Sequence, residues 1–382
     1  MIEESEKTEA LLMAELLKDI YTEAFLTTFS QQVQEVYRPF KAQQFVRAVL
    51  ADNWADLTLK QRTRQIAIVL GQFLPQDYSE AIALLEQLAP DCQGFAYLFF
   101  PDFVVVYGTR SDDWALSMHA LEIFTQQSSA EFAIRTFILT DPKRTMGQMT
   151  QWAQSANAHV RRLASEGCRP RLPWGESLPV FKQDPTPVLA ILERLKNDPE
   201  LYVRRSVANN LNDIVKDHPQ LVIETAKKWQ GQSEAVDWVI RHGCRTLLRK
   251  DFLAVQTLFG YAADSPAKPL VLAATIKTTA TTVAIGDKLA FHYQIRFRPE
   301  AKLLVRVEYA VDYVKANGQQ SRKLFKLAEK EIDGRQGLRG ERQINFKDLT
   351  TRKHYPGQHN VALIVNGREV AKTAFEVVRR EE

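Results

Sequence analysis

Hydrophobic positions recur at helical spacing from about residue 8 to residue 263. The first set comprises Leu11, Leu12, Leu16, Leu17 and Ile20. Short proline- and aspartate-containing breakers, such as Leu74-Pro75 and Asp217-His218-Pro219, separate successive segments. One apolar run, from Phe99 to Val106, has the composition of a strand, but we interpret it as a buried helix junction. The pattern therefore predicts one helix after another over this part of the chain.

A weak internal repeat lies in the middle of the helical part. Its three copies are Val160-Arg161-Arg162, Val203-Arg204-Arg205 and Val239-Ile240-Arg241, followed three residues later by Ser165, Ala208 and Cys244. The copies start 43 and 36 residues apart, which is within the period of HEAT and armadillo helix pairs. We therefore predict a HEAT-like α-solenoid. An irregular helical bundle is the alternative.

From about residue 270 the pattern changes to alternating apolar and polar positions, which is typical of strands. Asn366-Gly367 stands between two such runs and predicts a two-residue hairpin. About seven short strands in roughly 110 residues indicate an immunoglobulin-like β-sandwich. The predicted organisation is a helical domain at 1–263, a proline-containing linker at 264–269 and a sandwich at 270–382.

Charge is distributed unevenly along the chain. Residues 1–130 carry a net charge of −9, residues 131–267 carry +4 and residues 268–382 carry +9, so the total is +4. A basic middle and end suggest a polyanionic partner. The alternative is that these charges lie on unrelated solvated faces.

Several classes of protein are not indicated. The sequence has no apolar run of about 18 residues, and its acidic start lacks the features of a secretion signal. Three separated cysteines fit a reduced, cytoplasmic compartment. The seven histidines show no HxxxH pattern and no CxxC accompanies them, so we expect neither a metal nor a cofactor. No glycine-rich phosphate loop or nucleophile elbow is present.

The segment from His159 to Gly175 combines four arginines, a glutamate and a tryptophan. Its first half is predicted to be helical, and Arg162 and Glu166 are four residues apart, so they share one side. Pro170 and Pro173 then constrain an extended turn that presents Trp174 over the helix end. The structural alternatives are a surface ion pair for Glu166 and repeat-to-repeat packing for Trp174.

A second polar segment runs from Tyr202 to Ile214. Its apolar stripe consists of Val203, Val207, Leu211 and Ile214. Asn209, Asn212 and Asp213 lie elsewhere on this helix, where short polar side chains reduce helix propensity. We therefore expect them to contact a ligand or the backbone. Alternatively, Asp213 forms a hydrogen bond to a neighbouring repeat.

Three segments, Ala130 to Arg135, His159 to Trp174 and Arg204 to Pro219, resemble the AlkC branch of the AlkC/AlkD DNA alkylation-repair glycosylases. Thr136 departs from that pattern, which leads us to expect proline there. The similarity runs to about residue 260, and the sandwich resembles that of an AlkC subgroup with an immunoglobulin-like domain. The resemblance implies HEAT-like repeats, DNA in the concave cleft and removal of cationic lesions such as 3-methyladenine and 3-methylcytosine, for which the base need not be flipped into a pocket.

The resemblance also implies the site residues. The active-site positions fall on Glu131, Glu166, Trp174 and Asp213, with Arg162 in support and Glu122 as a neighbour of Glu131 in sequence. We expect Glu166 to stabilise a sugar that becomes cationic as the glycosidic bond breaks and to orient the attacking water. Glu131 and Asp213 would complete the acidic pocket, and Trp174 would contact the sugar or lesion by cation–π attraction.

The expected partner is double-stranded DNA with alkylated bases, bound by a monomeric, monofunctional glycosylase. The predicted phosphate-binding residues are Arg161, Arg162, Arg169, Arg171, Arg204, Arg205, Arg241, Arg245, Arg249 and Lys250. In the sandwich the predicted contacts are Arg296, Arg298, Arg335, Arg339 and Arg342. The alternative function is a non-catalytic HEAT-repeat scaffold that binds DNA or an acidic partner, for which Glu166 would be dispensable.

Overall fold

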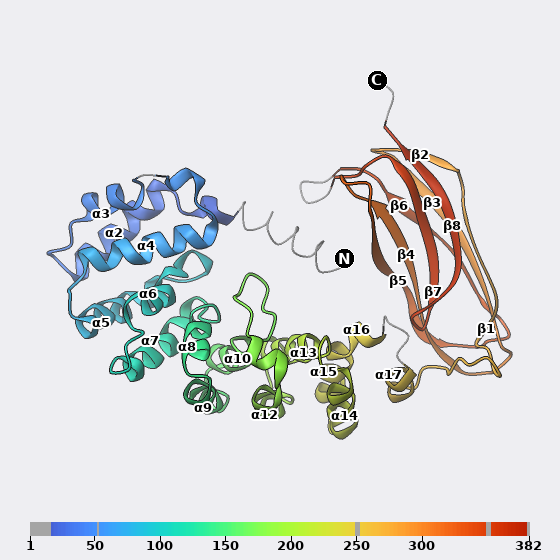
Figure 1. Cartoon of the computed structure of the whole chain (residues 1–382), viewed down its shortest axis with the longest axis horizontal. Helices are drawn as coiled ribbons and strands as arrows, with labels where there is room; N and C mark the ends of the chain where they lie inside the picture. Colours follow the sequence, from blue (N-terminus) through green and yellow to red (C-terminus); the bar gives the residue numbers. More distant parts are fainter. Residues whose placement is uncertain (1–16, 52, 249–252, 349–352, 380–382) are drawn as a thin grey trace. The chain divides into compact units, whose positions relative to one another are not determined.

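The computed structural model describes residues 17–51, 53–248, 253–348 and 353–379 (Figure 1). These residues form two compact units. The helical unit comprises the described residues of Ala10–Val222 and Trp229–Gly243. The sandwich unit comprises Ile223–Lys228 and the described residues from Cys244 onward. No helix among the described ranges is long and apolar enough to cross a membrane.

Short breakers and polar caps define the helices of the first unit. Asp77, Asp141 and Asn157 accept backbone N–H groups at the start of α5, α9 and α10, which stabilises a helix end by about 1 kcal/mol. The described helices are η1 (Lys18–Ile20), α2 (Glu23–Val36), α3 (Ala42–Val49), η2 (Trp54–Asp56), α4 (Leu59–Phe73), α5 (Tyr78–Leu88), η3 (Ala89–Asp91), η4 (Phe95–Tyr97), α6 (Phe99–Tyr107), α7 (Trp114–Gln127), α8 (Ile134–Thr140), α9 (Pro142–Trp152), α10 (Ala158–Glu166), α11 (Pro179–Gln183), α12 (Thr186–Leu195), α13 (Leu201–Ile214), α14 (Pro219–Trp229) and α15 (Glu234–Gly243).

The helices follow one another as a row from α2 to α15 (Figure 1). Contacts connect helices that are close in the sequence: α4 packs on α6, α7 on α10, α10 on α13 and α13 on α15. Neighbour-to-neighbour packing of this kind is typical of a helical solenoid. The three Val-x-Arg copies lie on α10, α13 and α15, and each of these helices packs on the next of the three.

Small residues let these three helices approach closely. The hydroxyls of Ser165 and Ser206 are 2.6 Å apart between α10 and α13. A Cβ added at Gly243 on α15 would lie 2.9 Å from the Cβ of Leu211 on α13. The predicted apolar stripe of α13 is buried. The repeat signal therefore marked close contacts between neighbouring helices.

The apolar run from Phe99 to Val106 forms helix α6 and no strand. Pro101 lies in its first turn, where the missing N–H of proline removes no helical hydrogen bond. Phe99, Phe100, Phe103 and Val104 are buried. Burial on several sides explains why the segment lacks the usual amphipathic pattern.

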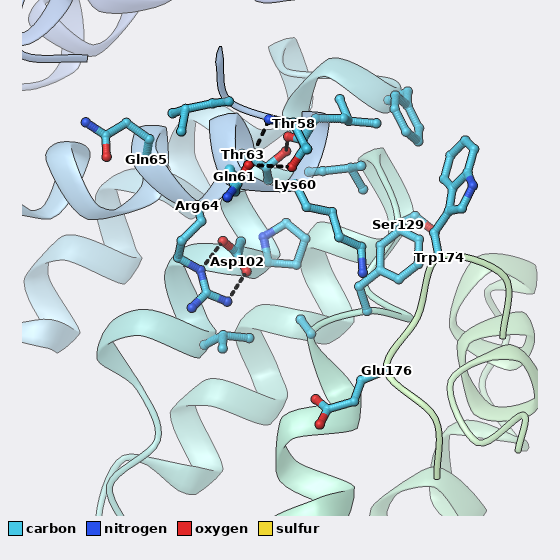
Figure 2. A pocket seen from close by; sticks show the side chains of 18 of the residues that line it. Thr58, Lys60, Gln61, Thr63, Arg64, Gln65, Asp102, Ser129, Trp174 and Glu176 are labelled. Atoms are coloured by element: carbon cyan, nitrogen blue, oxygen red, sulfur yellow. Dashed lines mark hydrogen bonds and ion pairs between the residues drawn. The ribbon is translucent and has the colours of Figure 1, made fainter. Parts of the chain in front are cut away.

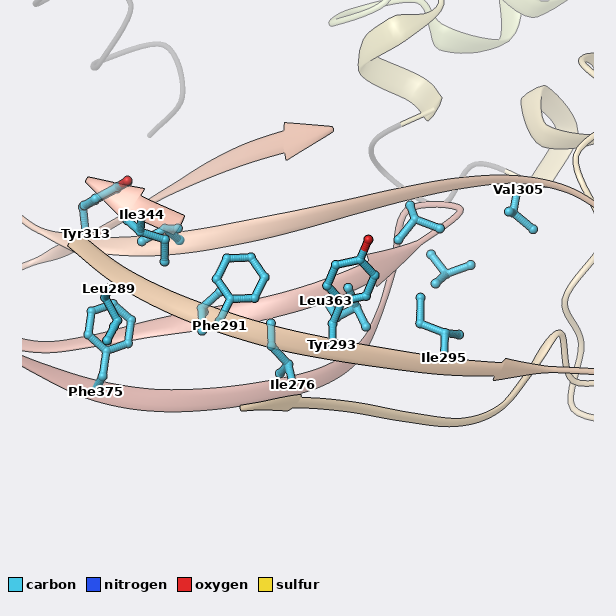
Figure 3. Close-up of a cluster of buried hydrophobic side chains, with 14 of the residues drawn as sticks. Ile276, Leu289, Phe291, Tyr293, Ile295, Val305, Tyr313, Ile344, Leu363 and Phe375 are labelled. Atoms are coloured by element: carbon cyan, nitrogen blue, oxygen red, sulfur yellow. The ribbon is translucent and has the colours of Figure 1, made fainter. Parts of the chain in front are cut away.

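Two antiparallel-rich sheets form the sandwich, which follows helices α16 (Arg245–Leu248) and α17 (Leu253–Leu258). The strand orders are β1-β3-β6 and β2-β8-β7-β4-β5. The strands are β1 (Val271–Thr278), β2 (Thr282–Ala284), β3 (Lys288–Phe297), β4 (Leu303–Val314), β5 (Gln320–Ile332), β6 (Leu338–Asn345), β7 (Gly357–Val365) and β8 (Arg368–Val378). Side chains such as Phe291, Ile295, Leu363 and Phe375 fill the core between the sheets (Figure 3). About seven strands were predicted, and the three-residue β2 is the additional one.

The predicted Asn366-Gly367 hairpin joins β7 to β8, with Val365 opposite Arg368. Both turn residues have positive φ, 46° and 83°, as a type I′ turn requires. Asn366 also accepts the backbone N–H of Arg306, donates to the carbonyl of Ala262 and accepts from Gln256 of α17 at its own carbonyl. The turn thus connects α17 to the sandwich.

The predicted linker segment is held against the sandwich. Asp264 accepts the backbone N–H of Leu270 at 2.7 Å and pairs with Arg368 at 2.9 Å. The guanidinium of Arg298 donates to the carbonyls of Ala263 and Lys268. The domain limits at 263 and 270 stay a prediction.

Candidate active site

Helix α10 ends at Glu166, the first of the predicted site residues. Gly167 follows it directly, and a Cβ at that position would lie 2.6 Å from Cγ2 of Ile134 on α8. Any larger residue would push α10 away from α8. This close approach brings the last turn of α10 next to Glu131, which lies in the turn preceding α8.

Three carboxylates and two guanidiniums form one chain of ion pairs here, which we call the carboxylate cluster (Glu131, Arg162, Glu166, Arg169 and Asp213). Arg162 lies 3.3 Å from Glu131 and 3.7 Å from Glu166. Arg169 lies 2.8 Å from Glu166 and 2.9 Å from Asp213. Glu131, Glu166 and Asp213 expose only 8%, 7% and 4% of their surface. Glu166 therefore does pair with Arg162, as the structural alternative predicted, but the pair is buried and not at the surface.

The cluster sets the protonation of its acids. Burial opposes ionisation of Glu166, but the nearby Arg169 and Arg162 outweigh it and hold the pKa of Glu166 below its ordinary value. For Asp213, burial is the larger effect, and it raises the pKa although Arg169 partly offsets it. Glu166 is therefore an anion at neutral pH, and the folded protein shifts the pKa values of the two acids in opposite directions.

Arg135 of α8 organises the segment that follows Glu166. Its Nη1 donates to the carbonyls of Gly167 and Arg169 at 3.0 and 2.9 Å, and its Nε donates to the carbonyl of Glu176. Arg135 is buried, and its Nη2 has no hydrogen-bond partner among the described residues. Burial lowers its pKa to about 10. It therefore fixes both ends of the segment that carries Arg169 and Trp174.

Trp174 adopts a left-handed backbone conformation, with φ of +60°. Such a conformation costs a residue with a large side chain about 1–3 kcal/mol. Its indole N–H is shielded from solvent and has no acceptor among the described residues. The ring packs edge-on against Phe95 at a centroid distance of 6.3 Å. A strained residue with an unsatisfied donor is typical of a functional position.

A cavity of about 660 Å³ lies beside the cluster (Figure 2). Residues from α4, α6 and the turn before α8 line it together with Trp174 and Glu176. Lys60 lies over the ring of Phe132 at 5.0 Å, and Arg64 pairs with Asp102 through two hydrogen bonds. None of the three cluster carboxylates lines the cavity, but Ser129 does, and its hydroxyl donates to Glu131.

Two known proteins are similar to this chain over nearly its whole length. The curated "Uncharacterized protein YhaZ" of Bacillus subtilis (strain 168) is 43% identical over 362 residues, which cover 94% of this chain and 99% of that protein. The solved structure of Pseudomonas fluorescens alkylpurine DNA glycosylase AlkC, bound to DNA containing an abasic site analog, matches with a TM-score of 0.87. It is 38% identical and covers 95% of this chain and 99% of its own.

The chain belongs to the AlkC family. A family model described as "Uncharacterised protein YhaZ, C-terminal Ig-like domain" matches residues 273–379. The predicted fold of this AlkC-family member, helical repeats followed by an immunoglobulin-like sandwich, is confirmed.

The structure brings the three predicted acids of this AlkC-family chain together. Asp213 also accepts a hydrogen bond from Arg169, which follows α10. The alternative interpretation of Asp213, a hydrogen bond to a neighbouring repeat, therefore describes a contact that is present. Glu122 lies elsewhere: its Oε2 accepts the indole N–H of Trp152 at 2.9 Å. The catalytic roles of Glu131, Glu166, Asp213 and Trp174 stay predictions.

Most of the predicted phosphate-binding residues have protein partners. Arg161 pairs with Asp198, Arg171 with Asp217, and Arg204 donates to the carbonyls of Asp198 and Pro199. Arg162 and Arg169 belong to the carboxylate cluster. Arg205 is exposed, Arg241 and Arg245 are half-buried, and Arg249 and Lys250 lie outside the described residues. Their binding to DNA stays a prediction.

The predicted arginines of the sandwich differ in availability. Arg298 is buried with Glu300 and two backbone carbonyls as partners, and Arg335 pairs with Asp333. Arg296, Arg339 and Arg342 are exposed on β3 and β6 of the three-stranded sheet. Arg342 donates to the carbonyl of Glu341, so Arg296 and Arg339 are the better candidates for an external partner.

Proposed function

We propose that this AlkC-family chain is a monofunctional DNA glycosylase that excises cationic alkylated bases from double-stranded DNA in base excision repair. The expected lesions are 3-methyladenine and 3-methylcytosine. One observation carries the proposal: three buried acids converge in a chain that is 38% identical to an alkylpurine DNA glycosylase bound to DNA.

Alkylation at N3 makes the base a cation and weakens its glycosidic bond, so little acid catalysis is needed. As that bond breaks, positive charge develops on the deoxyribose. An anion held beside the sugar stabilises this transition state more than the ground state and accelerates the reaction. Glu166 fits this task because its pKa is held below the ordinary value. The same carboxylate can orient the attacking water.

The electrostatic balance of the cluster favours a cation. With all five groups ionised, three carboxylates and two guanidiniums leave one net negative charge. Burial strengthens the interaction of that charge with a nearby cation. A neutral, undamaged base gains little from it. Selectivity for cationic lesions therefore follows from charge without hydrogen bonds to base edges.

Trp174 would support the cation through its indole ring. An indole face attracts a nearby cation by about 0.5–2 kcal/mol. The three carbonyl contacts of Arg135 hold the segment that carries this ring. The exposed arginines of the three-stranded sheet would add contacts to phosphates, and we expect the protein to act as a cytoplasmic monomer.

Incubation with dimethyl-sulfate-treated DNA, followed by mass spectrometry of the released bases, tests the proposal. We expect free 3-methyladenine and an intact strand that breaks only on alkaline treatment. Glu166→Gln should stop base release and retain DNA binding. Glu122→Gln is the matched control, because glutamine can still accept from Trp152. If no methylated base were released, the glycosylase proposal would be wrong and the non-catalytic HEAT-repeat scaffold would remain as the alternative function.

A further inference from the structure

We propose that the cavity between α4, α6 and Trp174 binds the neutral base after its release, as a product site beside the carboxylate cluster. This inference rests on the proposed glycosylase function and extends it. The site would take a planar, uncharged heteroaromatic ring. Its volume of about 660 Å³ lies within the range of small-molecule sites, about 300–1,000 Å³.

The walls of the cavity suit a flat, uncharged ring. Phe95, Phe132 and Trp174 line it together with aliphatic residues such as Leu98 and Val105. Aromatic walls bind planar rings through stacked or edge-to-face contacts. Figure 2 shows Trp174 next to Ser129, with Lys60 drawn between them and the pair of Arg64 and Asp102.

The charges of the cavity differ from those of the carboxylate cluster. Its charged lining residues are Lys60, Arg64, Asp102 and Glu176, which balance to zero when all are ionised. Arg64 and Asp102 neutralise each other directly through two hydrogen bonds. A cation is therefore held better by the cluster, with its one net negative charge, than by this cavity.

Lys60 further disfavours a cationic occupant. Its ammonium lies over the ring of Phe132 at 5.0 Å and occupies the aromatic face that a cationic base would use. Burial, followed by the charge of Arg135, lowers the pKa of Lys60. Adding a second positive charge there would be unfavourable for the same reasons. The base loses its charge when the glycosidic bond breaks, so only the product matches this cavity.

Ser129 connects the two sites. It lines the cavity, its hydroxyl donates to Glu131, and that hydroxyl accepts from Arg162 at 3.2 Å. The cavity is therefore adjacent to the cluster, and a base released at the cluster can enter it.

Equilibrium dialysis of the full chain without DNA tests the proposal directly. The probes are 3-methyladenine and the 3,9-dimethyladeninium cation, whose N9 methyl group keeps the positive charge. We expect saturable binding of the neutral base that is about tenfold tighter than binding of the cation. Lys60→Gln should reduce this ratio by improving the affinity of the cation while leaving that of the neutral base within about twofold.

A pair of variants on α6 locates the binding. Val105→Phe fills the cavity and should weaken binding of 3-methyladenine by about tenfold. Val106→Phe is the matched control, because Val106 is the next residue of the same helix and does not line the cavity. Thr136→Phe fills the cavity from α8 and serves if Val105→Phe fails to fold. In assays with methylated DNA, added 3-methyladenine should slow the wild type more than Val105→Phe.

The outcomes separate this inference from the proposed function. Base release with free-base binding that neither filling variant affects would overturn the product site alone. Binding of the free base without any release from methylated DNA would overturn the glycosylase and leave the cavity as a nucleobase site. If Val105→Phe weakened DNA binding but not free-base binding, the cavity would hold an unstacked base of the duplex, and the product site would be wrong.

Discussion

Arg169 donates from Nε to Oδ2 of Asp213 over 2.9 Å, although 44 positions separate the two residues in the chain. The same guanidinium binds Glu166 through Nη1. All three side chains are buried. Arg169 therefore holds Glu166 and Asp213, which come from adjacent helical repeats, close to each other.

Replacing Arg169 with methionine should be strongly destabilising. It leaves two carboxylates buried without their main partner, which costs about 3–5 kcal/mol in the free energy of unfolding. Arg171→Met is the control, because its ion pair with Asp217 is about one-quarter exposed and should contribute about 1 kcal/mol or less. Urea denaturation at pH 7 measures both. Equal losses would contradict the role assigned to Arg169.

The pH dependence of stability should have opposite signs for Glu166 and Asp213. The pKa of Glu166 is lowered in the folded protein, so its stabilising contribution is complete above the unfolded value of about 4.3 and is lost as the pH falls through the folded value. The pKa of Asp213 is raised, so its contribution is lost as the pH rises through the folded value.

Unfolding of the wild type, Glu166→Gln and Asp213→Asn between pH 3 and pH 8 tests these signs. We expect the advantage of the wild type over Glu166→Gln to shrink at low pH. Its advantage over Asp213→Asn should instead shrink as the pH rises. Parallel curves for the two variants would show that the two acids are not differently perturbed.

Substitutions of Trp174 can separate backbone strain from the role of the ring. Trp174→Gly and Trp174→Ala both remove the ring, but only glycine adopts positive φ without penalty. Trp174→Gly should therefore be the more stable by about 1 kcal/mol. Both should slow excision by about 2- to 30-fold, the equivalent of 0.5–2 kcal/mol of cation–π stabilisation. Thermal unfolding and single-turnover excision are the measurements.

Arg135→Lys should disturb the segment from Gly167 to Glu176. Lysine keeps the charge but cannot reproduce the fork of donors that reaches three carbonyls. We expect a loss of about 1–3 kcal/mol in stability and a fall in kcat that exceeds the change in KM. Arg144→Lys, on α9 over Trp114, is the control. A change confined to stability would make Arg135 merely structural.

The three-stranded sheet can be tested through the salt dependence of DNA binding. If Arg296 and Arg339 each contact one phosphate, Arg296→Glu/Arg339→Glu should weaken binding and flatten the plot of log affinity against log salt by about 1.8. Lys302→Glu/Lys330→Glu makes the same charge change beside β4 and on β5. Identical slopes for both double variants would remove this sheet face from the interface.

The fold was largely accessible from the sequence because its signals are local. Helical spacing, caps and breakers act within a few residues, and Asn366-Gly367 specifies its own turn geometry. The strand-like composition of Phe99 to Val106 was ambiguous because burial on several sides removes the alternation that distinguishes the two structures. Only packing against neighbouring helices determines whether such a segment forms a helix or a strand.

The candidate site was accessible only in part. The spacing of Arg162 and Glu166 predicted their shared side, and the two residues do lie 3.7 Å apart. The roles of Arg169 and Arg135 could not be inferred, since each depends on partners more than 30 positions away in the chain. Arginines that looked available for phosphate, such as Arg161, are paired with acids that the pattern did not connect to them.

The hydrogen bonds of Asn366 also affect the order in which parts of the protein fold during synthesis. Gln256 of α17 and the carbonyl of Ala262 find their partner 110 and 104 residues later in the chain. A growing chain on the ribosome therefore cannot form these two hydrogen bonds until its last hairpin has emerged. The earlier helices, whose contacts are with near neighbours, can assemble while synthesis continues.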